Sequence, residues 1–272
     1  MSLDVLPRRA GPRRGHRPAL STFVLGLSGL VLLAAAEEVV ARSGLVSTQY
    51  LPPASVILTR LGELLTNAPF LADLGATAGS ALLALVIAVP AGLVVGLVLG
   101  LVPAVHTATR IVVDLLRPVP AVAIVPLLVL VTGTGRASVV ITIVSATVWP
   151  VLLNTIHGVR DVDGVALQTA RLYGARLPRR LAEIVLPSAA PVIAAGVRVS
   201  IGLALVIAVA AELLIGTDSG VGAYLLAATQ GGSHTDYAFA AVCAAGLLGL
   251  VVNGAARALE RRFLPWSEGE PR

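Results

Sequence analysis

Six runs of mostly apolar residues, separated by polar connections, dominate the chain. A helix needs about 20 apolar residues to cross the roughly 30 Å of hydrocarbon in a bilayer, and most of these runs reach that length. The pattern predicts six transmembrane helices, at residues 22–41, 74–101, 119–132, 137–156, 190–215 and 237–256.

Proline marks the two irregular runs. The third is short and is interrupted by Pro118, Pro120 and Pro126, so Ile111 to Leu116 could be recruited as a preceding helical piece. The second is long and contains Pro90, which predicts a tilted or kinked helix.

The composition indicates a membrane protein built from helices. Of the 272 residues, 56% are hydrophobic and 13% are charged, about half the charged share of an ordinary soluble domain. The mean hydropathy of +0.90 excludes a water-soluble surface, because exposed apolar area of that extent aggregates. Aromatic residues make up only 4%, which favours helices over a barrel with aromatic girdles. We expect an all-α integral membrane protein.

All basic side chains are arginines, and their positions predict the orientation. With both ends inside, sixteen of the 20 basic residues face the cytoplasm; Arg42, Arg60 and Arg136 lie outside, and Arg198 lies within a span. This bias is a strong positive-inside signal. We expect a cytoplasmic arm at 1–21 and a cytoplasmic tail at 257–272. The net charge of +5 therefore reflects topology rather than nucleic-acid binding.

Several kinds of chemistry are excluded by residue type. Without lysine the chain has no P-loop and no Schiff-base lysine. A single cysteine excludes an internal disulfide and a thiolate zinc site. The four histidines are scattered, and neither paired carboxylates nor a nucleophile elbow is found. We expect no enzymatic activity and no metal or cofactor bound by this chain.

The region at 22–72 has two open questions. Its apolar run follows basic residues and contains Ala34-Ala35-Ala36, as a cleaved signal peptide would, but its length and the five later spans favour a retained anchor. Beyond Pro52-Pro53 an amphipathic helix is predicted, which either lies at the outer membrane surface or packs as a linker. Its apolar face comprises Ile57, Leu61, Leu64 and Leu65.

Small residues recur at four-residue spacing in two of the spans. The second run has Gly92, Gly96 and Gly100, and the fifth has Gly196 and Ser200 followed by Ala204. A face without bulky side chains lets another helix approach closely. We expect a tightly packed bundle, with contacts that could continue into a second subunit.

A polar stretch at 160–187 separates the fourth and fifth spans and lies inside by the arginine count. Asp161 or Asp163 can cap a helix running to about Tyr173, which Gly174 can end in the left-handed conformation. A second short helix is predicted to begin near Pro178 and to end before Pro187. The sequence thus predicts a compact two-helix cytoplasmic loop within the core at 73–256.

This loop resembles a motif of binding-protein-dependent ABC importer permeases: Glu-Ala-Ala, three residues, glycine, nine residues, Ile-x-Leu-Pro. Here Gln168-Thr169-Ala170 is followed by Gly174 and, nine residues later, by Ile184-Val185-Leu186-Pro187. The spacing is kept, although Gln168 replaces the glutamate and Thr169 the first alanine.

Shorter matches outside the loop are similar to the nitrate/sulfonate/taurine branch of these permeases. The resemblance covers roughly residues 51–265. The matching segments are Leu115-Leu116-Arg117-Pro118-Val119-Pro120, Pro126-Leu127-Leu128, Pro150–Thr155, Gly158-Val159-Arg160, Gly196-Val197-Arg198, Ala211-Glu212 and Leu259-Glu260-Arg261-Arg262.

The resemblance implies a permease subunit of an ATP-driven importer in the bacterial cytoplasmic membrane. It further implies a separate ATPase pair that holds ATP and Mg, an extracytoplasmic substrate-binding protein and a permease homodimer. The solute would be a small anion such as a sulfonate, taurine or nitrate. The ATPase would contact the loop near Ala170 and Gly174. The implied coupling residues are Gln168, Thr169, Ala170, Arg171, Tyr173, Gly174, Ala175, Ile184, Leu186 and Pro187.

The alternative is a carrier driven by an ion gradient, or a channel, which would place ionisable groups deep in its spans. Arg198 either serves such a pathway or pairs near the inner face, and Glu212 either lines an outer vestibule or binds a helix end. Trp149 and Asn154 either face the pathway or pack between helices. An intramembrane enzyme is a third possibility, but no motif supports it.

Overall fold

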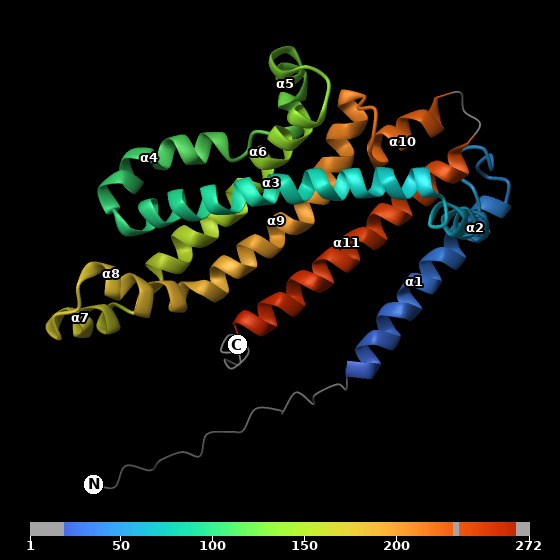
Figure 1. Ribbon diagram of the computed structural model, residues 1–272. Coiled ribbons are helices and arrows are strands. Elements are labelled where there is room, and N and C mark those ends of the chain that lie inside the picture. Colours follow the sequence, from blue (N-terminus) through green and yellow to red (C-terminus); the bar gives the residue numbers. More distant parts are fainter. Residues whose placement is uncertain (1–18, 231–233, 265–272) are drawn as a thin grey trace, which may run out of the picture. The chain divides into compact units, whose positions relative to one another are not determined.

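The computed structural model describes residues 19–230 and 234–264 (Figure 1). The predicted arm at 1–21 lies almost wholly outside the described residues, and so does the second half of the tail. The described residues form helices and connections with no strand, which confirms the all-α prediction. The chain divides into two compact units, Met1–Val56 and Ile57–Arg272.

The first unit contains one long apolar helix, α1 (Ala19–Arg42). At its end the Glu38 carboxylate accepts hydrogen bonds from Arg42 Nε at 2.6 Å and from the backbone N–H of Ser55 at 2.9 Å. These bonds tie Ser55, two residues after Pro53, to the end of α1.

The second unit holds the remaining helices, except that α2 begins within the first unit, just before the boundary. Those long enough to span a membrane are α3 (Ala68–Leu101), α6 (Arg136–Arg160), α9 (Leu186–Ile215) and α11 (Thr235–Phe263). The shorter elements are α2 (Ala54–Leu64), α4 (Pro103–Leu116), η1 (Ala121–Ile124), α5 (Val125–Thr132), α7 (Gly164–Leu172), α8 (Leu177–Arg180), η2 (Leu181–Val185) and α10 (Val221–Thr229).

The third predicted span, at 119–132, corresponds to η1 and α5, and α4 is a separate helical piece before it. The pieces Pro103–Leu116 and Ala121–Thr132 meet at an angle of 78°. The described residues therefore contain five helices that could each cross a membrane, or six spans if this bent pair counts as one. Pro118 and Pro120 fall in the break, where they lack the N–H that a continuous helix requires. The first piece starts at Pro103, well before the predicted Ile111.

Close approach of α3 to α6 forms the centre of this unit. A Cβ added at Gly96 would lie 2.6 Å from the Cβ of Thr155 and 2.9 Å from the Leu152 carbonyl oxygen. Added carbons at Gly92 and Gly100 would likewise meet Val151 and Val159 at 2.9 Å. The absence of side chains along this stripe is what allows α3 to pack directly on the α6 backbone.

A second small-residue contact holds α9 against α6. Gly196 lies against Asn154 and the Pro150 carbonyl, where an added Cβ would come within 2.7 Å of each. Four residues on, the buried Ser200 hydroxyl donates a 2.6 Å hydrogen bond to the Thr147 carbonyl oxygen. The predicted tight bundle is confirmed, and α6 is the helix that both glycine-bearing faces share.

The apolar face of α2 packs inside the protein. Ile57, Leu61 and Leu64 join a buried cluster with residues of α10 and α11, whereas Leu65 is exposed. Of the two interpretations of this helix, the packed linker agrees with its buried face. In Figure 1, α7 and α8 lie together at one end of the second unit, and α10 lies at the other.

We predict that Gly96→Val lowers the stability of the protein by about 1–3 kcal/mol, because overpacking a tight contact costs that much. The matched control is Gly246→Val in α11, where an added Cβ would meet nothing within 4 Å. Thermal unfolding in detergent measures both variants. Equal melting temperatures for the two would contradict the direct contact of α3 with α6.

Candidate functional site

The polar connection between α6 and α9 begins with a capped helix. The Asp163 carboxylate accepts a 2.8 Å hydrogen bond from the backbone N–H of Val165, which makes Asp163 rather than Asp161 the N-cap of α7. A carboxylate at this position satisfies one of the free N–H groups of the first turn and interacts well with the helix dipole.

Glycine ends α7 in the predicted way. Gly174 has φ of 74°, in the left-handed region. Its N–H donates to the Arg171 carbonyl at 3.0 Å, and the N–H of Ala175 donates to the Ala170 carbonyl at 2.9 Å. These two bonds form a Schellman motif, which fixes the turn that follows the helix.

One side of α7 is anchored and the other is free. Leu167 and Val162 pack against a buried cluster of Val159, Val185 and Ala189, from α6, η2 and α9. Leu172, the last residue of α7, is 88% exposed, and Tyr173, which follows it, is 87% exposed. A short helix that is fixed beneath and carries free apolar side chains above is suited to contact a partner.

The second loop helix differs from its prediction. It begins at Leu177, close to the predicted Pro178, but it does not end before Pro187. The chain is helical without a break from Leu177 to Ile215. A wider turn accommodates the proline, because the Leu186 N–H donates to the Leu181 carbonyl across η2. Such π-type turns relieve the clash that a proline ring causes in a regular helix.

The residues implied by the motif are therefore divided between two elements. Ala170 and Ala175 are half-buried at the end of α7, and Gly174 is exposed between them. Gln168, Thr169, Arg171 and Tyr173 are exposed on and after α7, whereas Ile184, Leu186 and Pro187 belong to the long helix that continues into α9.

Glu212, one of the four pathway candidates, binds a helix end. Its side chain is buried, and Oε2 accepts hydrogen bonds from Thr77 Oγ1 at 2.8 Å and from the N–H of Gly222 at 3.0 Å. The neighbouring N–H groups of Gly220 and Val221 donate to Asp73 and Thr77. Side chains of α3 and α9 thus hold the first N–H groups of α10, which satisfies donors that the helix cannot pair itself.

Arg198 pairs with a carboxylate, which agrees with one of the two interpretations of this residue. Its guanidinium contacts Glu260 of α11 in a half-buried ion pair. The pair joins two of the short segments on which the resemblance rested, Gly196-Val197-Arg198 and Leu259-Glu260-Arg261-Arg262. Sequence reasoning had not connected them, because 62 residues separate the partners.

Trp149 and Asn154 do not meet the other two candidates. The Asn154 amide donates a 2.8 Å hydrogen bond to the Pro150 carbonyl of its own helix, and the side chain also lies against Gly196. Trp149 is half-buried on α6. The four candidates therefore do not form one site, and three of them stabilise contacts between or within helices.

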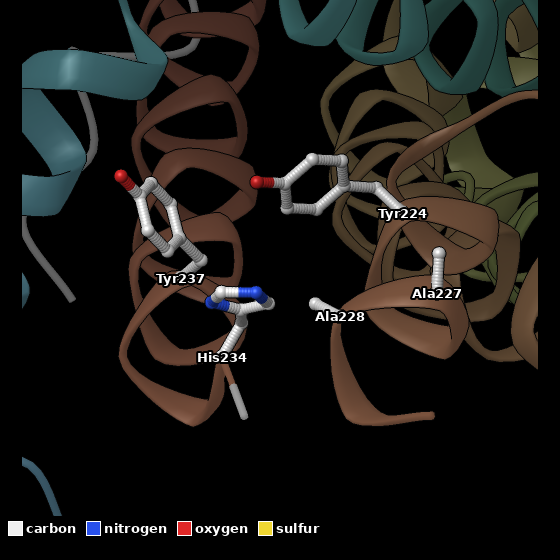
Figure 2. Close-up of a pocket in the computed structure, with 5 residues that line it drawn as sticks. All are labelled: Tyr224, Ala227, Ala228, His234 and Tyr237. Carbon is white, nitrogen blue, oxygen red and sulfur yellow. The ribbon is translucent and has the colours of Figure 1, made fainter. Parts of the chain in front are cut away.

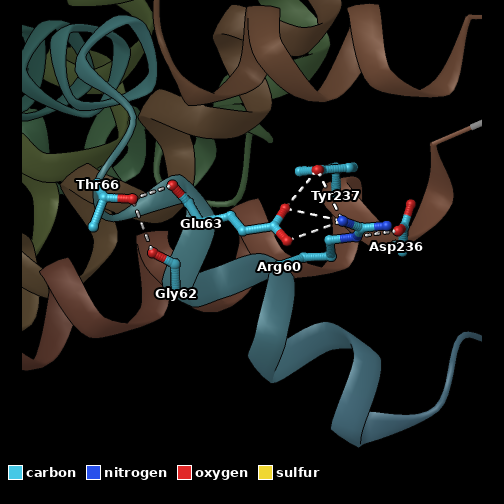
Figure 3. Close-up of polar contacts among 6 residues, drawn as sticks. All are labelled: Arg60, Gly62, Glu63, Thr66, Asp236 and Tyr237. Carbon is cyan, nitrogen blue, oxygen red and sulfur yellow. Dashed lines mark hydrogen bonds and ion pairs between the residues drawn. The ribbon is translucent and has the colours of Figure 1, made fainter.

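A polar cluster at the far end of the unit from α7 was missed at the sequence level (Figure 3). Arg60 Nε donates to Asp236 at 2.7 Å, and Nη1 donates to Glu63 at 3.0 Å. The Arg60 guanidinium carbon also lies 4.7 Å from the centre of the Tyr237 ring, and the Tyr237 hydroxyl donates to Glu63 at 2.6 Å. The only available signal was that Arg60 and Glu63 fall outside the apolar face of α2.

Opposite charges and hydrogen bonds shift the ionisation of this cluster. The bond from the Tyr237 hydroxyl, with the one from Arg60, lowers the pKa of Glu63 below its ordinary value of 4.5. The bond to Asp236, together with that to Glu63, raises the pKa of Arg60. Arg60 and Glu63 are therefore both charged at neutral pH, and the contacts of Arg60 and Glu63 with Asp236 and Tyr237 join α2 to the start of α11.

Beside this cluster lies an aromatic cavity of about 300 Å³ (Figure 2). Tyr224, His234 and Tyr237 line it, and the Tyr224 ring packs edge-on against Phe70 with 4.9 Å between ring centres. Partial burial raises the pKa of the Tyr224 hydroxyl. Among the described residues, no group of three or more His, Cys, Asp or Glu side chains could hold a metal ion.

Comparison with known proteins gives the family. Residues 88–265 match the family described as binding-protein-dependent transport system inner membrane component. The chain belongs to this family. It is thus a permease subunit of an ABC importer, in which a separate subunit hydrolyses ATP. Permeases of this kind work with that ATPase and with a binding protein, which removes the alternative of a gradient-driven carrier.

Individual relatives match this chain over most of its length. A Bacillus subtilis protein named for aliphatic sulfonate transport is 32% identical over 88% of this chain and 87% of its own length. The taurine transport system permease protein of Escherichia coli is 31% identical over 92% of both. A chain of a crystal structure of a bacterial alginate ABC transporter shares the fold, with a TM-score of 0.62 and 15% identity over 90% of this chain and 94% of that one.

We predict that Glu212→Ala destabilises the permease by about 1–3 kcal/mol, because it leaves the buried Gly222 N–H without an acceptor. Glu212→Gln keeps an acceptor oxygen and should cost less. Thermal unfolding in detergent separates the two. If the alanine variant melts at the wild-type temperature, the carboxylate does not hold α10.

We also predict that the Glu63 carboxylate stabilises the permease only when it is charged. Because its pKa is lowered on folding, this stabilisation is complete above pH 4.5 and is lost as the pH falls through the lower folded value. The measurement compares wild-type and Glu63→Gln melting temperatures across pH. The difference should be constant near neutral pH and should disappear in acid; a difference that does not depend on pH would contradict the assignment.

Proposed function

We propose that the free face of α7 is the surface through which the ATPase drives this permease. The proposal rests on one observation. Leu172 and Tyr173, at the end of α7, are exposed, whereas Leu167 of the same helix packs against the bundle. The kept spacing of Ala170, Gly174 and Pro187 supports it. Small residues at Ala170 and Gly174 allow a partner surface to approach closely.

The continuous helix from Leu177 to Ile215 suggests how movement would be passed on. A push on α7 reaches η2 and α9 through their shared buried cluster. Because α9 packs tightly on α6 at Gly196 and Ser200, the displacement would then move both helices together. Closure of the ATPase pair on ATP would in this way shift the bundle between inward-open and outward-open states.

In this proposal the α7 end faces the cytoplasm, and so do both termini. The arginine distribution supports that orientation, since Arg160, Arg171, Arg176, Arg179 and Arg180 all fall in or next to the loop. The arm at 1–21 and the tail at 257–272 would lie on the same side. The aromatic cavity and the Arg60 cluster, at the other end, would face the binding protein.

The transported solute is proposed to be a small organic or inorganic anion. Support comes from the sulfonate and taurine relatives, which match over most of their own length. We further propose that two copies of this chain form the pathway, as the resemblance to the nitrate/sulfonate/taurine branch implies. An extracytoplasmic binding protein would then supply the anion to the pair.

The test introduces a charge on the proposed contact. Leu172→Asp should abolish uptake and co-purification of the ATPase, because an unpaired carboxylate in an apolar interface is costly to desolvate. Leu172 is almost fully exposed, so the amount of permease in the membrane should not change. The assay follows radiolabelled taurine uptake in cells expressing the whole transporter, together with the ATPase retained on a tagged permease.

Leu45→Asp is the matched control, because Leu45 is 82% exposed and lies outside α7. It should retain both uptake and the ATPase. Gly174→Asn and Gly174→Glu extend the test, since asparagine tolerates the left-handed backbone whereas glutamate adds bulk and charge. Normal ATPase binding by Leu172→Asp and Gly174→Glu would contradict the docking surface.

A further inference from the structure

A second cavity, of about 350 Å³, lies between α4 and the last turns of α6. Since one water molecule takes up about 30 Å³, the cavity has room for roughly ten of them. Its polar lining comes from His106, Thr109, Arg110, Asp114, Arg117, His157 and Arg160, and its apolar lining from Leu99, Val113, Leu153 and Ile156. The cavity thus combines several basic groups with a hydrocarbon wall.

The charges of this cavity are not balanced. Asp114 lies 3.7 Å from Arg110 and is the only carboxylate in the lining. Within the described part of the chain, neither Arg117 nor Arg160 makes an ion pair. Three arginines and one aspartate leave two positive charges of the lining without a partner. A concave surface of this kind attracts an anion.

The two faces of α4 differ in character. The face toward the cavity carries His106, Arg110 and Asp114. The opposite face is apolar and exposed, with Ile111 at 71% and Leu115 at 67%. No residue of α4 is buried. A basic pocket bordered by an exposed apolar helix offers separate places for the phosphate and the acyl chains of one lipid molecule.

We propose that this cavity binds a phosphate-type oxyanion, supplied by the headgroup of an anionic phospholipid. Arg117 and Arg160 provide the unpaired charge, Arg110 completes the pocket, and Asp114 limits the affinity by competing for Arg110. Arg160 ends α6 three residues before Asp163, the N-cap of α7. A bound lipid would therefore order the segment from which the loop starts. This proposal does not depend on α7 being the ATPase contact.

The test measures bound lipid directly. The full chain, co-expressed with its ATPase, is placed in nanodiscs of phosphatidylcholine mixed equally with phosphatidylglycerol and then examined by native mass spectrometry. The wild type should retain phosphatidylglycerol. Arg117→Gln combined with Arg160→Gln should lower its affinity by about fivefold for each arginine, since one basic residue near an anionic surface contributes about that much.

Three further variants exclude general effects of charge or misfolding. Arg117→Lys with Arg160→Lys keeps the charge and the topology signal and should retain the lipid. Asp114→Asn should raise the affinity, which a role of these residues in topology alone does not predict. Arg257→Gln removes an exposed arginine of α11 outside the cavity and should have no effect.

Inorganic phosphate distinguishes the two sources of the anion. If phosphate displaces phosphatidylglycerol only at high concentration, the lipid headgroup is the ligand. If phosphate raises the melting temperature of the wild type but not of the glutamine variant, and no lipid is retained, the same pocket binds a free oxyanion. The proposal is overturned if the wild type, the glutamine variant and Asp114→Asn all bind both probes alike.

Discussion

The contact between the backbones of α3 and α6 is the constraint on which the rest of the bundle depends. In a bilayer, lipid tails are as apolar as the helix surfaces, so helices associate through close packing and hydrogen bonds rather than through the hydrophobic effect. The glycines at 92, 96 and 100 allow α3 to lie directly on α6. Because α6 also contacts α9 through Gly196 and Ser200, these contacts together fix the positions of α3, α6 and α9 relative to one another.

The polar side chains of the spans mainly hold this arrangement in place. Glu212 binds the start of α10, Arg198 joins α9 to α11, and Asn154 bonds to its own helix. Each of these three side chains has a partner, as is expected where an unpaired polar group is costly. An ionisable residue within a span is therefore not by itself evidence of a transport pathway. Among the described residues, Arg117 and Arg160 make no ion pair, and both line the cavity beside α4.

Transmission of force through the loop requires the anchored side of α7 as much as its exposed side. A flexible connection could not transmit a force, whereas α7 is capped at Asp163, closed at Gly174 and packed through Leu167. The unbroken helix beyond it links that element to a membrane span. Local hydrogen bonds set the shape of α7, and tertiary packing connects it to the bundle.

The sequence alone determined the number and type of the apolar segments, the small-residue stripes, and the cap and end of α7. These features depend on hydrophobicity, spacing and local hydrogen bonds, which neighbouring residues fix. Only the tertiary structure decided that Ala121–Thr132 lies at 78° to the helix before it, that the helix continues through Pro187, and that Arg198 meets Glu260 and Arg60 meets Asp236. The ion-pair partners are far apart in the sequence, and a proline permits either a break or a widened turn, so packing in three dimensions selects the outcome.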